Sequence, residues 1–502
     1  MRATLSRQRG QAMVFTLAFG VATGLVALLL FNSGMLANTK TRLQNAADAG
    51  AYSAGVLQAR DHNFSAYTNR AMIANQVAVV QLASLKSYLE DAADTHDRMG
   101  GALLTVEALL PVDKPLWDTG KSLPIESVNA AFSAVAGPAV KGLDLLIKGY
   151  ETAQEAHHVA TALNMAQVAD ETIKRNDPDA QLTKAAFFVG RTTVQVKAWN
   201  DSTQRLRANG TSAESDRFGD AVVSDKSTDL FTRFRGSVPT PQWRNTEVTL
   251  CRLLPNYVSS NTWFMFTHAG SSLLSTNKKR WLSMDATVGA GSQSCTFWYP
   301  CWTGICYTTE TSPLFDNNFI GGSGGAVAGE DGGYNTSTGY KNNPTISKLY
   351  GGAIALPSGW IRYIEGPGTT LDSAGGLQDY YRDVSNASGN KPKDQTPELN
   401  GAAWSVTLEA EHTGDKIRTA AKILPDATRI HLTDGMQGDT LRALAGAQSY
   451  FYRAKDDGSM FTRSGWHRSD GKTEMMNLFS PYWQARLSDR SNADRAASWA
   501  AQ

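Results

Sequence analysis

The sequence lacks a charge imbalance and the local motifs of common enzyme sites. Its 502 residues carry a formal net charge of +1, and no long basic run follows the N-terminus, which disfavours recognition of nucleic acid by a charged face. There is no G-x4-G-K-[ST] phosphate loop and no H-E-x-x-H zinc motif. Because 42% of the residues are hydrophobic and only 19% charged, most of the chain is expected to fold around a core. The sequence therefore predicts a folded protein, and these patterns indicate no cofactor.

The longest stretch without charge runs from residue 10 to residue 39, and its apolar part, Ala12–Phe31, is 20 residues long. A helix of that length spans about 30 Å, one hydrocarbon thickness. A cleaved signal peptide is the alternative, but its apolar region would be shorter, and "MLAN" places Met35 where a small residue is needed. We therefore expect a retained anchor. Arg2, Arg7 and Arg9 should hold its N-terminus in the cytoplasm and send the body across the membrane.

Small residues recur on one side of this helix and of its expected continuation. Gly20 and Gly24 have the small-xxx-small spacing that lets membrane helices approach closely, although glycine is also common in membrane helices for other reasons. Beyond the membrane, an alanine–glycine stripe with helical spacing buries little area per residue and so needs a partner surface nearby. The predicted helix-packing residues are Gly20, Gly24, Ala46, Ala47, Gly50 and Ala54.

Further along the chain, helical patterns give way to strand patterns. A second helix is expected over 126–176, kinked or divided at Pro138, and another over 182–206. From residue 235, aromatic and β-branched runs alternate with Gly, Asn and Ser, which is typical of strands. The glycine-rich stretch 320–335 is predicted to be a loop, 402–412 a late strand, and 441–454 a return to helix. The fold class is therefore α+β, with helices first and an antiparallel β-rich region second.

Four cysteines, Cys251, Cys295, Cys301 and Cys306, make up the whole set. An even number outside the cytoplasm favours two disulfides, for which three connectivities are possible. A zinc site is the alternative, but gaps of five and four residues do not make a C-x2-C knuckle. We expect disulfides and leave their pairing open.

Three of these cysteines frame a run of aromatic residues, "SCTFWYPCWTGICYTT" at 294–309. One interpretation makes Trp298, Tyr299 and Trp302 exposed contacts for adhesion or subunit docking on a disulfide-closed loop. The other places these rings in the core of a β-hairpin that a disulfide pins to Cys251. The second interpretation is the one we expect.

No other cluster of polar residues indicates chemistry. His157 and His158 are adjacent on a helix, about 100° apart, and are predicted to be solvated rather than metal ligands. Glu409, Glu411 and His412 could form an acid–base cluster, but an exposed strand end is the expected arrangement.

The N-terminal region resembles the TadG-like proteins of tight-adherence (Flp) pilus systems. In that family an R-G-Q start leads into an apolar helix followed by L-Q-N-A-A-D-A-A-A. Weaker similarity is present at 69–81 and 478–487. The matching positions are Gly10, Gln11, Leu43, Gln44, Asn45, Ala46, Ala47, Asp48 and Ala49.

This resemblance implies a single-pass protein of the bacterial inner membrane that has a cytoplasmic N-terminus and a periplasmic body and is not an enzyme. Its partners would be membrane lipid, other pilin-like or pseudopilin subunits and inner-membrane platform proteins, with no nucleic acid. The corresponding organisation is a cytoplasmic basic N-terminus (1–11), a transmembrane helix (12–37), a periplasmic helical region (38–207), a linker (208–234), a β-rich domain with disulfides (235–440) and a C-terminal helical segment and tail (441–502).

Two family features are missing. Prepilin-type leaders are cut after a glycine and are followed by a glutamate at the fifth position, but the fifth residue after Gly10 is Phe15, so we expect an unprocessed anchor. Some larger relatives carry a metal-dependent adhesion domain that starts D-x-S-x-S. The strings at Asp372 and Asp457 do not fit, so no metal is expected there.

The leading hypothesis is therefore a structural assembly component of a tight-adherence pilus or a related secretion system. A minor pilin or tip adhesin that uses the aromatic, cysteine-rich region is the alternative. A membrane-tethered periplasmic hydrolase is a third hypothesis, which lacks any nucleophile–base or metal constellation.

Overall fold

The computed structural model describes the chain in two compact units. Unit 1 comprises Met1–Tyr67, Ala153–Gln204 and Arg382–Gln502, and unit 2 comprises Thr68–Thr152 and Arg205–Tyr381. The residues described are 11–107, 124–204, 222–224, 227–236, 242–244, 249–274, 280–313, 319–329, 368–372, 383–384, 405–423, 435–436, 438–452 and 477–500. The predicted positions Arg2, Arg7, Arg9, Gly10 and Asp457, and most of the predicted linker, lie outside them.

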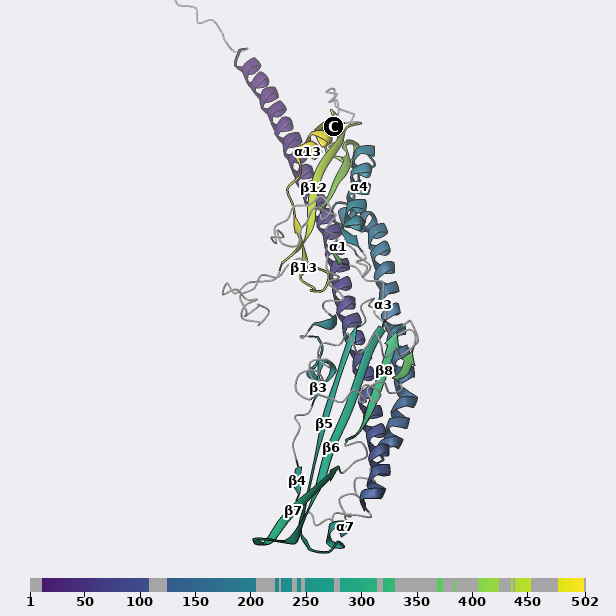
Figure 1. Ribbon diagram of the computed structural model, residues 1–502. Helices are drawn as coiled ribbons and strands as arrows, with labels where there is room; N and C mark the ends of the chain where they lie inside the picture. The colour runs from purple at the N-terminus through teal and green to yellow at the C-terminus, as the bar shows by residue number, and fades with distance from the viewer. Residues whose placement is uncertain are drawn as a thin grey trace, which may run out of the picture. The chain divides into compact units, whose positions relative to one another are not determined.

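Two long helices contribute to both units (Figure 1). Helix α1, Gln11–Glu107, has 97 residues without a break, so the expected continuation of the apolar helix into the body is confirmed. Helix α3, Ile125–Asn176, has 52 residues and ends at the predicted place. Pro138 lies inside α3 and does not divide it. A proline removes one hydrogen bond from a helix, and a helix of this length has many others to offset that cost.

Unit 1 contains a four-stranded antiparallel sheet in the order β1-β11-β12-β13. Its β11 matches the predicted late strand, whereas the predicted helix over 182–206 is shorter in the structure and is preceded by a strand. The elements of unit 1 besides α1 and α3 are β1 (Ala180–Leu182), α4 (Ala186–Ser202), β2 (Thr203–Gln204) paired with β10 (Asp383–Val384), β11 (Ser405–Thr413), η6 (Gly414–Lys416), α11 (Ala420–Ile423), β12 (Thr440–Phe451), β13 (Trp483–Leu487) and α13 (Asn492–Ala500).

The core of unit 1 forms where the small-residue stripe of α1 meets α3 and the sheet. A Cβ atom on Gly50 would lie 2.8 Å from Cγ1 of Ile173 in α3, and one on Gly55 would lie 3.2 Å from Cβ of Ala447 in β12. Only glycine lets the α1 backbone come this close without displacing its neighbours. The partner surface that the stripe needs is therefore provided by the same chain. The stripe residues Leu43, Ala46, Ala47 and Ala54 are buried in this core.

The predicted helix over 441–454 is wrong, since Thr440–Phe451 form strand β12. Residues 443–449 are all buried, and β12 pairs with β11 on one side and β13 on the other. A continuous run of small apolar residues has neither helical nor strand periodicity when both faces of the element are covered. The sheet position, which the local sequence does not encode, decides the conformation.

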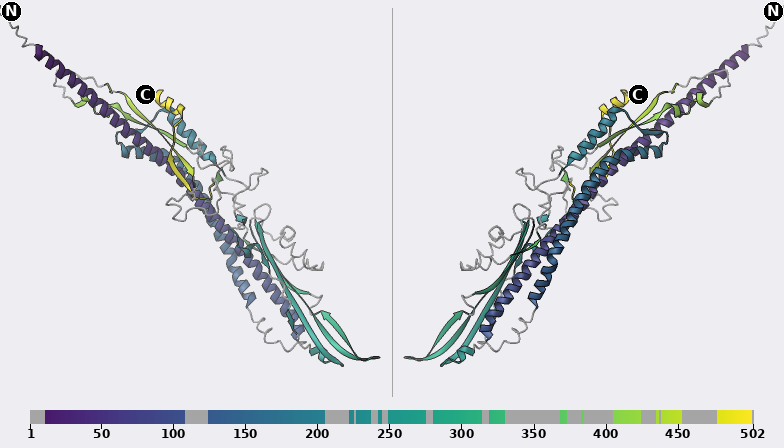
Figure 2. Two further views of the ribbon diagram at one scale, coloured as in Figure 1. Left: turned by 90° about the vertical axis from the view of Figure 1, so that its left-hand side faces the viewer. Right: turned by 90° about the vertical axis from the view of Figure 1, so that its right-hand side faces the viewer.

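Unit 2 contains a second, larger sheet that is antiparallel except where β8 pairs with β9. Its strand order is β3-β5-β6-β8-β9, with β4 also paired to β5 and β7 to β6. Strands β5 and β6 form a long ribbon (Figure 2). The elements are α6 (Leu230–Arg233), β3 (Arg235–Gly236), β4 (Gln242–Arg244), α7 (Thr249–Arg252), β5 (Tyr257–Leu274), β6 (Arg280–Cys301), β7 (Gly304–Pro313), β8 (Phe319–Gly329) and β9 (Gly368–Asp372).

The glycine-rich stretch predicted as a loop contains strand β8, and only 330–335 lie outside the described residues. Its glycines face the α1 backbone: a Cβ on Gly322 would lie 2.3 Å from the Thr95 amide nitrogen, and one on Gly324 would lie 2.1 Å from the Ser87 carbonyl oxygen. Glycine here permits close approach of strand to helix rather than flexibility. The loop prediction was wrong because composition alone does not separate these two uses.

Substitution of Gly324 tests this packing. Gly324→Ala places a methyl group against helix backbone that has no flexible end to move, so the free energy of unfolding should fall by about 1–3 kcal/mol or more. The matched control is Gly142→Ala on α3, where a Cβ meets nothing within 4 Å, and which should raise the same free energy by up to about 1 kcal/mol. Urea unfolding of the detergent-solubilised protein measures both. Equal stability of the two variants would contradict the close approach of β8 to α1.

Candidate interaction sites

The first candidate site is the N-terminal part of α1. Apart from the half-buried Leu28, its large apolar side chains between Met13 and Phe31 are 40–76% exposed, and none of the most hydrophobic window of the helix is buried by the residues that the structure describes. Side chains added at Gly20 or Gly24 would meet no other atom within 4 Å. An apolar surface of this extent on a folded protein marks a membrane or partner contact. The segment therefore has the length and exposure of a membrane anchor, or of a signal segment near an N-terminus.

Helix α3 also has the length and composition of a membrane span, but it contributes to the folded body. Met165, Ala169 and Ile173 on α3 belong to the core of unit 1. Its most apolar window is partly buried, unlike that of α1. The packing therefore favours α3 as a core helix.

The L-Q-N-A-A-D-A motif lies at the seam between α1 and β12. Gln44 Nε2 donates to Asp48 Oδ1 at 2.9 Å and to the Leu444 carbonyl oxygen of β12 at 3.1 Å, and Lys40 Nζ donates to the Arg442 carbonyl. Of the other motif residues, Asp48 and Ala49 are half-buried and Asn45 is exposed. The predicted packing face of Ala46, Ala47, Gly50 and Ala54 is therefore occupied within the chain, whereas Gly20 and Gly24 remain open.

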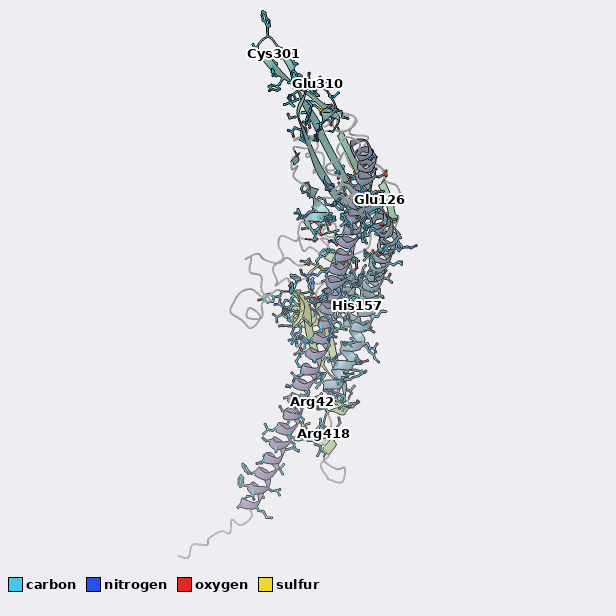
Figure 3. The ribbon with its side chains drawn as sticks, turned by 90° about the horizontal axis from the view of Figure 1, so that it is seen from below. Arg42, Glu126, His157, Cys301, Glu310 and Arg418 are labelled. Carbon is cyan, nitrogen blue, oxygen red and sulfur yellow. A yellow bond between two sulfur atoms is a disulfide. The ribbon has the colours of Figure 1, made fainter. Side chains whose placement is uncertain are left out.

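A buried histidine–aspartate cluster follows on α1 in unit 1. Asp61 Oδ1 accepts from His157 Nδ1 at 2.8 Å, and its Oδ2 accepts from His158 Nδ1 at 2.6 Å. The side chain of His158 is 2% exposed and that of Asp61 1%, so the prediction of two solvated histidines is wrong for His158, while His157 is partly exposed. Figure 3 labels His157 beside α1. His158 can be buried because the carboxylate of Asp61, 97 residues away in sequence, accepts its hydrogen bond.

The neighbouring His62 extends this cluster. Trp199 Nε1 donates to His62 Nε2 at 2.9 Å, and the His62 ring lies 4.2 Å from the ring centroid of Trp483. The pKa of His62 is lowered to about 3, mainly by burial. The charge of Asp61 acts to raise this pKa, and His158 acts to lower it further. Burial alone would raise the pKa of Asp61, but the hydrogen bonds from the two histidines outweigh it and hold that pKa at about 2. Near neutral pH the cluster therefore holds an ionised Asp61 and a neutral His62.

Of the two acidic residues of β11, Glu409 is buried and Glu411 is half-buried. Glu409 is 0% exposed, accepts from Arg442 Nη1 at 2.8 Å and accepts from the Ser498 hydroxyl. Glu411 accepts from Gln181 Nε2 and the Thr183 hydroxyl, both at 3.0 Å. The expected exposed strand end is therefore wrong, and these carboxylates tie β11 to the elements beside it.

Unit 2 has its own buried charges. Arg235 and Asp285 form a bidentate pair at 2.7 and 2.8 Å, both almost fully buried. His268 Nδ1 lies 3.1 Å from Asp91 Oδ2 on α1, and Asp91 also accepts from the Thr287 hydroxyl. Burial would lower the pKa of His268, but hydrogen bonds to Asp285 and Asp91 raise it to about 9, so this histidine is charged at neutral pH. The contacts of Asp91 hold the sheet of unit 2 to α1, whereas the Arg235–Asp285 pair joins β3 to β6 within the sheet.

The string G-x-S-x-G, which in some hydrolases marks a nucleophile, occurs at Gly321–Gly325. A nucleophile elbow needs its serine on a sharp turn between a strand and a helix. Ser323 lies instead within strand β8, is 1% exposed, and its amide donates to Asp94 Oδ2 at 2.9 Å. The string is therefore part of the packing against α1.

The β6–β7 hairpin is the second candidate site. Cys301 and Cys306 form one disulfide and Cys251 and Cys295 the other, so the expectation of two disulfides is confirmed and the pairing is now set. The first closes the hairpin end around the two-residue turn Trp302–Thr303, where Gly304 has φ +122°. Figure 3 labels Cys301 near the end of this hairpin.

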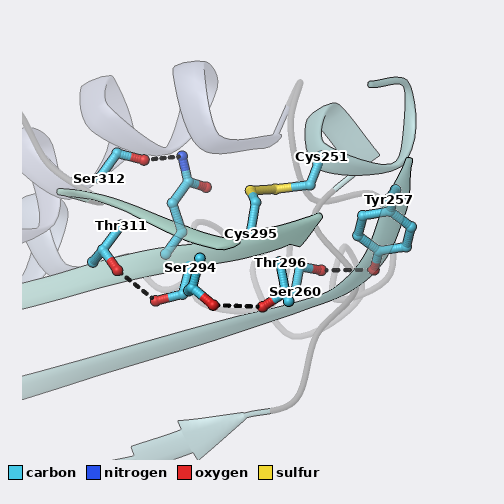
Figure 4. The surroundings of a disulfide bond; sticks show 10 residues. Cys251, Tyr257, Ser260, Ser294, Cys295, Thr296, Thr311 and Ser312 are labelled. Carbon is cyan, nitrogen blue, oxygen red and sulfur yellow. Dashed lines mark hydrogen bonds between the residues drawn. A yellow bond between two sulfur atoms is a disulfide. The ribbon is translucent and has the colours of Figure 1, made fainter. Parts of the chain in front are cut away.

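The second disulfide lies further along the same hairpin, where short polar side chains cross between strands (Figure 4). Ser294 and Thr311 share a hydrogen bond of 3.1 Å, and Thr296 and Thr309 one of 3.0 Å. Cross-strand hydroxyl pairs and the Cys301–Cys306 disulfide keep this exposed hairpin in register without a core of its own, while Cys251–Cys295 ties β6 to α7.

The aromatic residues of this hairpin face outward, so the interpretation that places them in a core is wrong. Trp302 is fully exposed, and Trp298 and Tyr299 are 39% and 44% exposed. Ile305 and Tyr307 on β7 add exposures of 65% and 64%. We call Trp298, Tyr299, Trp302, Ile305 and Tyr307 the aromatic tip. The rings are exposed because the hairpin end is held by cross-strand bonds and a disulfide rather than by packing.

Comparison with known proteins gives one match. Residues 10–60 match the family model described as "Putative Flp pilus-assembly TadE/G-like". No curated protein and no solved structure matches the chain. The match covers the exposed apolar part of α1 and the motif at its seam with β12, so the resemblance expected from the N-terminal residues is confirmed there.

The depressed pKa of His62 predicts that unit 1 is sensitive to acid. The unfolded chain binds a proton at this imidazole below pH 6.5, whereas the folded chain does so only near pH 3, so its contribution to stability is present above pH 6.5 and is lost as the pH falls towards 3. Between pH 7 and 5 the loss is roughly 2 kcal/mol.

Hydrogen–deuterium exchange of α4 peptides, corrected for intrinsic rates, measures this loss. The variant His62→Gln keeps an acceptor for Trp199 and should remove most of the pH dependence, whereas His96→Gln in unit 2 should keep it. A wild-type profile that is flat between pH 7 and 5 would refute a neutral, buried His62.

Proposed function

We propose that this protein is a structural assembly component of a bacterial Flp (tight-adherence) pilus or a related secretion system, anchored in the inner membrane by Ala12–Phe31. The observation that carries the proposal is the TadE/G-like match over residues 10–60, which coincides with an uncovered apolar helix. The arginines before the helix favour a cytoplasmic N-terminus and a periplasmic body. Two disulfides in that body fit an oxidising compartment.

Within this proposal, the membrane segment is the part of α1 that meets other pilin-like subunits. The stripe of Ala46, Ala47 and Gly50 is filled by α3 and β12, so it has no free face for a second chain. Gly20 and Gly24 have open space on their side of the helix, and such spacing allows close contact between helices in lipid. Lateral partners, including platform proteins, would therefore contact this protein inside the bilayer.

The anchor is proposed to remain unprocessed. A prepilin-type helix carries a glutamate at the fifth mature position that neutralises a neighbouring amino terminus inside the membrane, whereas Phe15 takes that place here and is 74% exposed. An apolar ring in lipid seeks no charged partner. The segment thus suits a permanent anchor better than a subunit of a regular fibre.

The anchor is tested by charges in its centre. The double substitution Leu25→Asp and Leu29→Asp should shift the protein out of the carbonate-resistant membrane fraction, because each charge costs about 2.5–3.5 kcal/mol at a helix centre. The matched control is Leu145→Asp with Leu146→Asp, two exposed leucines of α3, which should leave the protein in that fraction. If both pairs behave like the wild type, the anchor is not Ala12–Phe31.

A second candidate function, a minor pilin or tip adhesin, is favoured by the aromatic tip. Exposed Trp and Tyr side chains on a rigid, disulfide-closed hairpin are the residue types that dominate binding energy at interfaces. Residues 286–309 carry no charge, which suits an apolar contact. A membrane-tethered hydrolase gains no support from the described residues, since Asp61, His158 and Glu409 are sealed from solvent.

Substitutions in the aromatic tip distinguish the two proposed functions. Replacing Trp298, Tyr299 and Trp302 by Ser should reduce surface attachment of cells at least about tenfold while leaving filament number unchanged if the tip is the adhesive contact. Trp499→Ser, which removes an 80% exposed tryptophan from α13, is the matched control and should change neither. Attachment and filaments are counted by microscopy. Loss of filaments in the triple variant, with normal protein level, would instead assign the tip to assembly.

A further inference from the structure

Three potential metal ligands meet in unit 1 where α3 ends and the sheet begins. Asp177 and Asp179 follow α3 in a tight turn, in which the Asp179 amide donates to Asp177 Oδ1 at 3.4 Å. The next residue, Ala180, pairs with His412 in the β1–β11 register. Ligand atoms of Asp177, Asp179 and His412 lie within 4.8 Å of one another. Nothing in the sequence pattern joins these residues, because 233 positions separate the histidine from the nearer aspartate.

Asp177 has a buried oxygen that the protein leaves unpaired. Its side chain is 1% exposed, and its Oδ1 accepts from Arg42 Nη2 at 3.2 Å, but its Oδ2 has no hydrogen-bond partner among the described residues. A buried carboxylate oxygen without a partner is costly, so it requires either water or a cation. This oxygen is an independent sign of a ligand at the cluster.

His412 is prepared to act as a ligand. It is 4% exposed, and its Nδ1 lies 3.0 Å from the Thr413 carbonyl oxygen, which can only accept. Nδ1 therefore carries the proton, and the lone pair is on Nε2. A backbone carbonyl that fixes the tautomer in this way is the usual second contact of a metal-binding histidine.

We propose that Asp177, Asp179 and His412 bind a divalent transition metal, with Zn²⁺ the best fit. One imidazole with two carboxylates suits Zn²⁺, whereas Ca²⁺ and Mg²⁺ prefer oxygen ligands alone. Bonds of about 2.0–2.2 Å require the three ligand atoms to draw together by roughly 1 Å from the widest separation. Asp179 is 48% exposed and can make that movement, while the two buried residues stay in place.

Two basic side chains already contact the carboxylates of the cluster and would compete with a bound metal ion. Arg42 holds Asp177 Oδ1, and Lys416 Nζ lies 3.1 Å from Asp179 Oδ1. The Lys416–Asp179 pair is half-exposed at both ends, and such pairs contribute little, so the metal displaces the lysine at small cost. The bound ion would tie the end of α3 to β11, which gives the site a structural role.

Zinc titration of the purified full-length protein tests the site. The protein carries a tag without histidine, is treated with EDTA and dialysed, and is then titrated with Zn²⁺ by calorimetry and with Co²⁺ by visible absorption. The expected result is one ion per chain. Asp179→Asn and His412→Gln should each weaken Zn²⁺ binding roughly 10–100-fold and reduce the cobalt absorption. Asp489→Asn, an exposed aspartate of the same unit outside the cluster, should bind like the wild type.

Two results would overturn the proposal. One is a wild-type protein that binds no Zn²⁺ more tightly than about 100 μM, a concentration at which adventitious surface sites respond. The other is an Asp179→Asn variant that binds like Asp489→Asn, which would place any bound ion on other histidines. Asp179 is exposed, so its variant is expected to fold, and far-UV circular dichroism checks this independently of metal.

Discussion

The structure depends on the close approach of one helix backbone to two sheets. In unit 1 the small residues that allow this approach lie on the helix, at Gly50 and Gly55, and face Ile173 and Ala447. In unit 2 they lie mainly on the strand side, where Gly324 of β8 faces the α1 backbone. Small residues bury less area than leucine would, but they bring more backbone atoms into close contact. These short contacts contribute to stability because dispersion attraction weakens steeply with distance. A single added methyl group should therefore destabilise the packing of α1 in either unit.

Close packing leaves little room for water, so the polar groups around α1 must satisfy one another. Unit 1 does this with an ionised Asp61 of α1 between two imidazoles of α3, and unit 2 with Asp91 of α1, which contacts His268 of β5 and the Thr287 hydroxyl of β6. Such buried pairs add modest net stability but make the loss of either partner costly, at about 3–5 kcal/mol. They specify which part of α1 meets α3 in unit 1 and which part meets the sheet of unit 2, a choice that alanine and glycine alone would leave undetermined. The two histidines with shifted pKa values, His62 and His268, are shifted in opposite directions because only His268 is held by two carboxylates.

Sequence patterns correctly predicted the elements whose conformation is determined by nearby residues. The apolar run of α1, the end of α3 at Asn176 and strand β11 follow from hydropathy, turn residues and alternation, and the structure has all three. Strands β8 and β12 were missed, because runs of glycine and alanine have no period that separates a loop or helix from a strand buried on both faces. The burial of His158 and Glu409 depends on partners far away in sequence, Asp61 and Arg442, and no local pattern reports them. The exposure of Trp302 was missed for the opposite reason, since a hydrophobic ring is normally assigned to a core and the hairpin has none.

The N-terminal segment of α1 and the aromatic tip are apolar surfaces that differ in a way that bears on their partners. The N-terminal segment presents mainly aliphatic and phenylalanine side chains over 20 residues without a charge, and the hydroxyls of Thr16 and Thr23 donate to carbonyl oxygens of the same helix. The aromatic tip is short, and its Trp and Tyr rings carry N–H and O–H groups beside rows of serine and threonine hydroxyls. Rings of this kind suit an interface that is apolar at its centre and wet at its rim, as in protein–protein contacts. The small-residue stripe of α1 at Ala46, Ala47 and Gly50 packs within the fold of unit 1, whereas the N-terminal segment and the aromatic tip offer two chemically distinct surfaces, one suited to lipid and one suited to a folded partner.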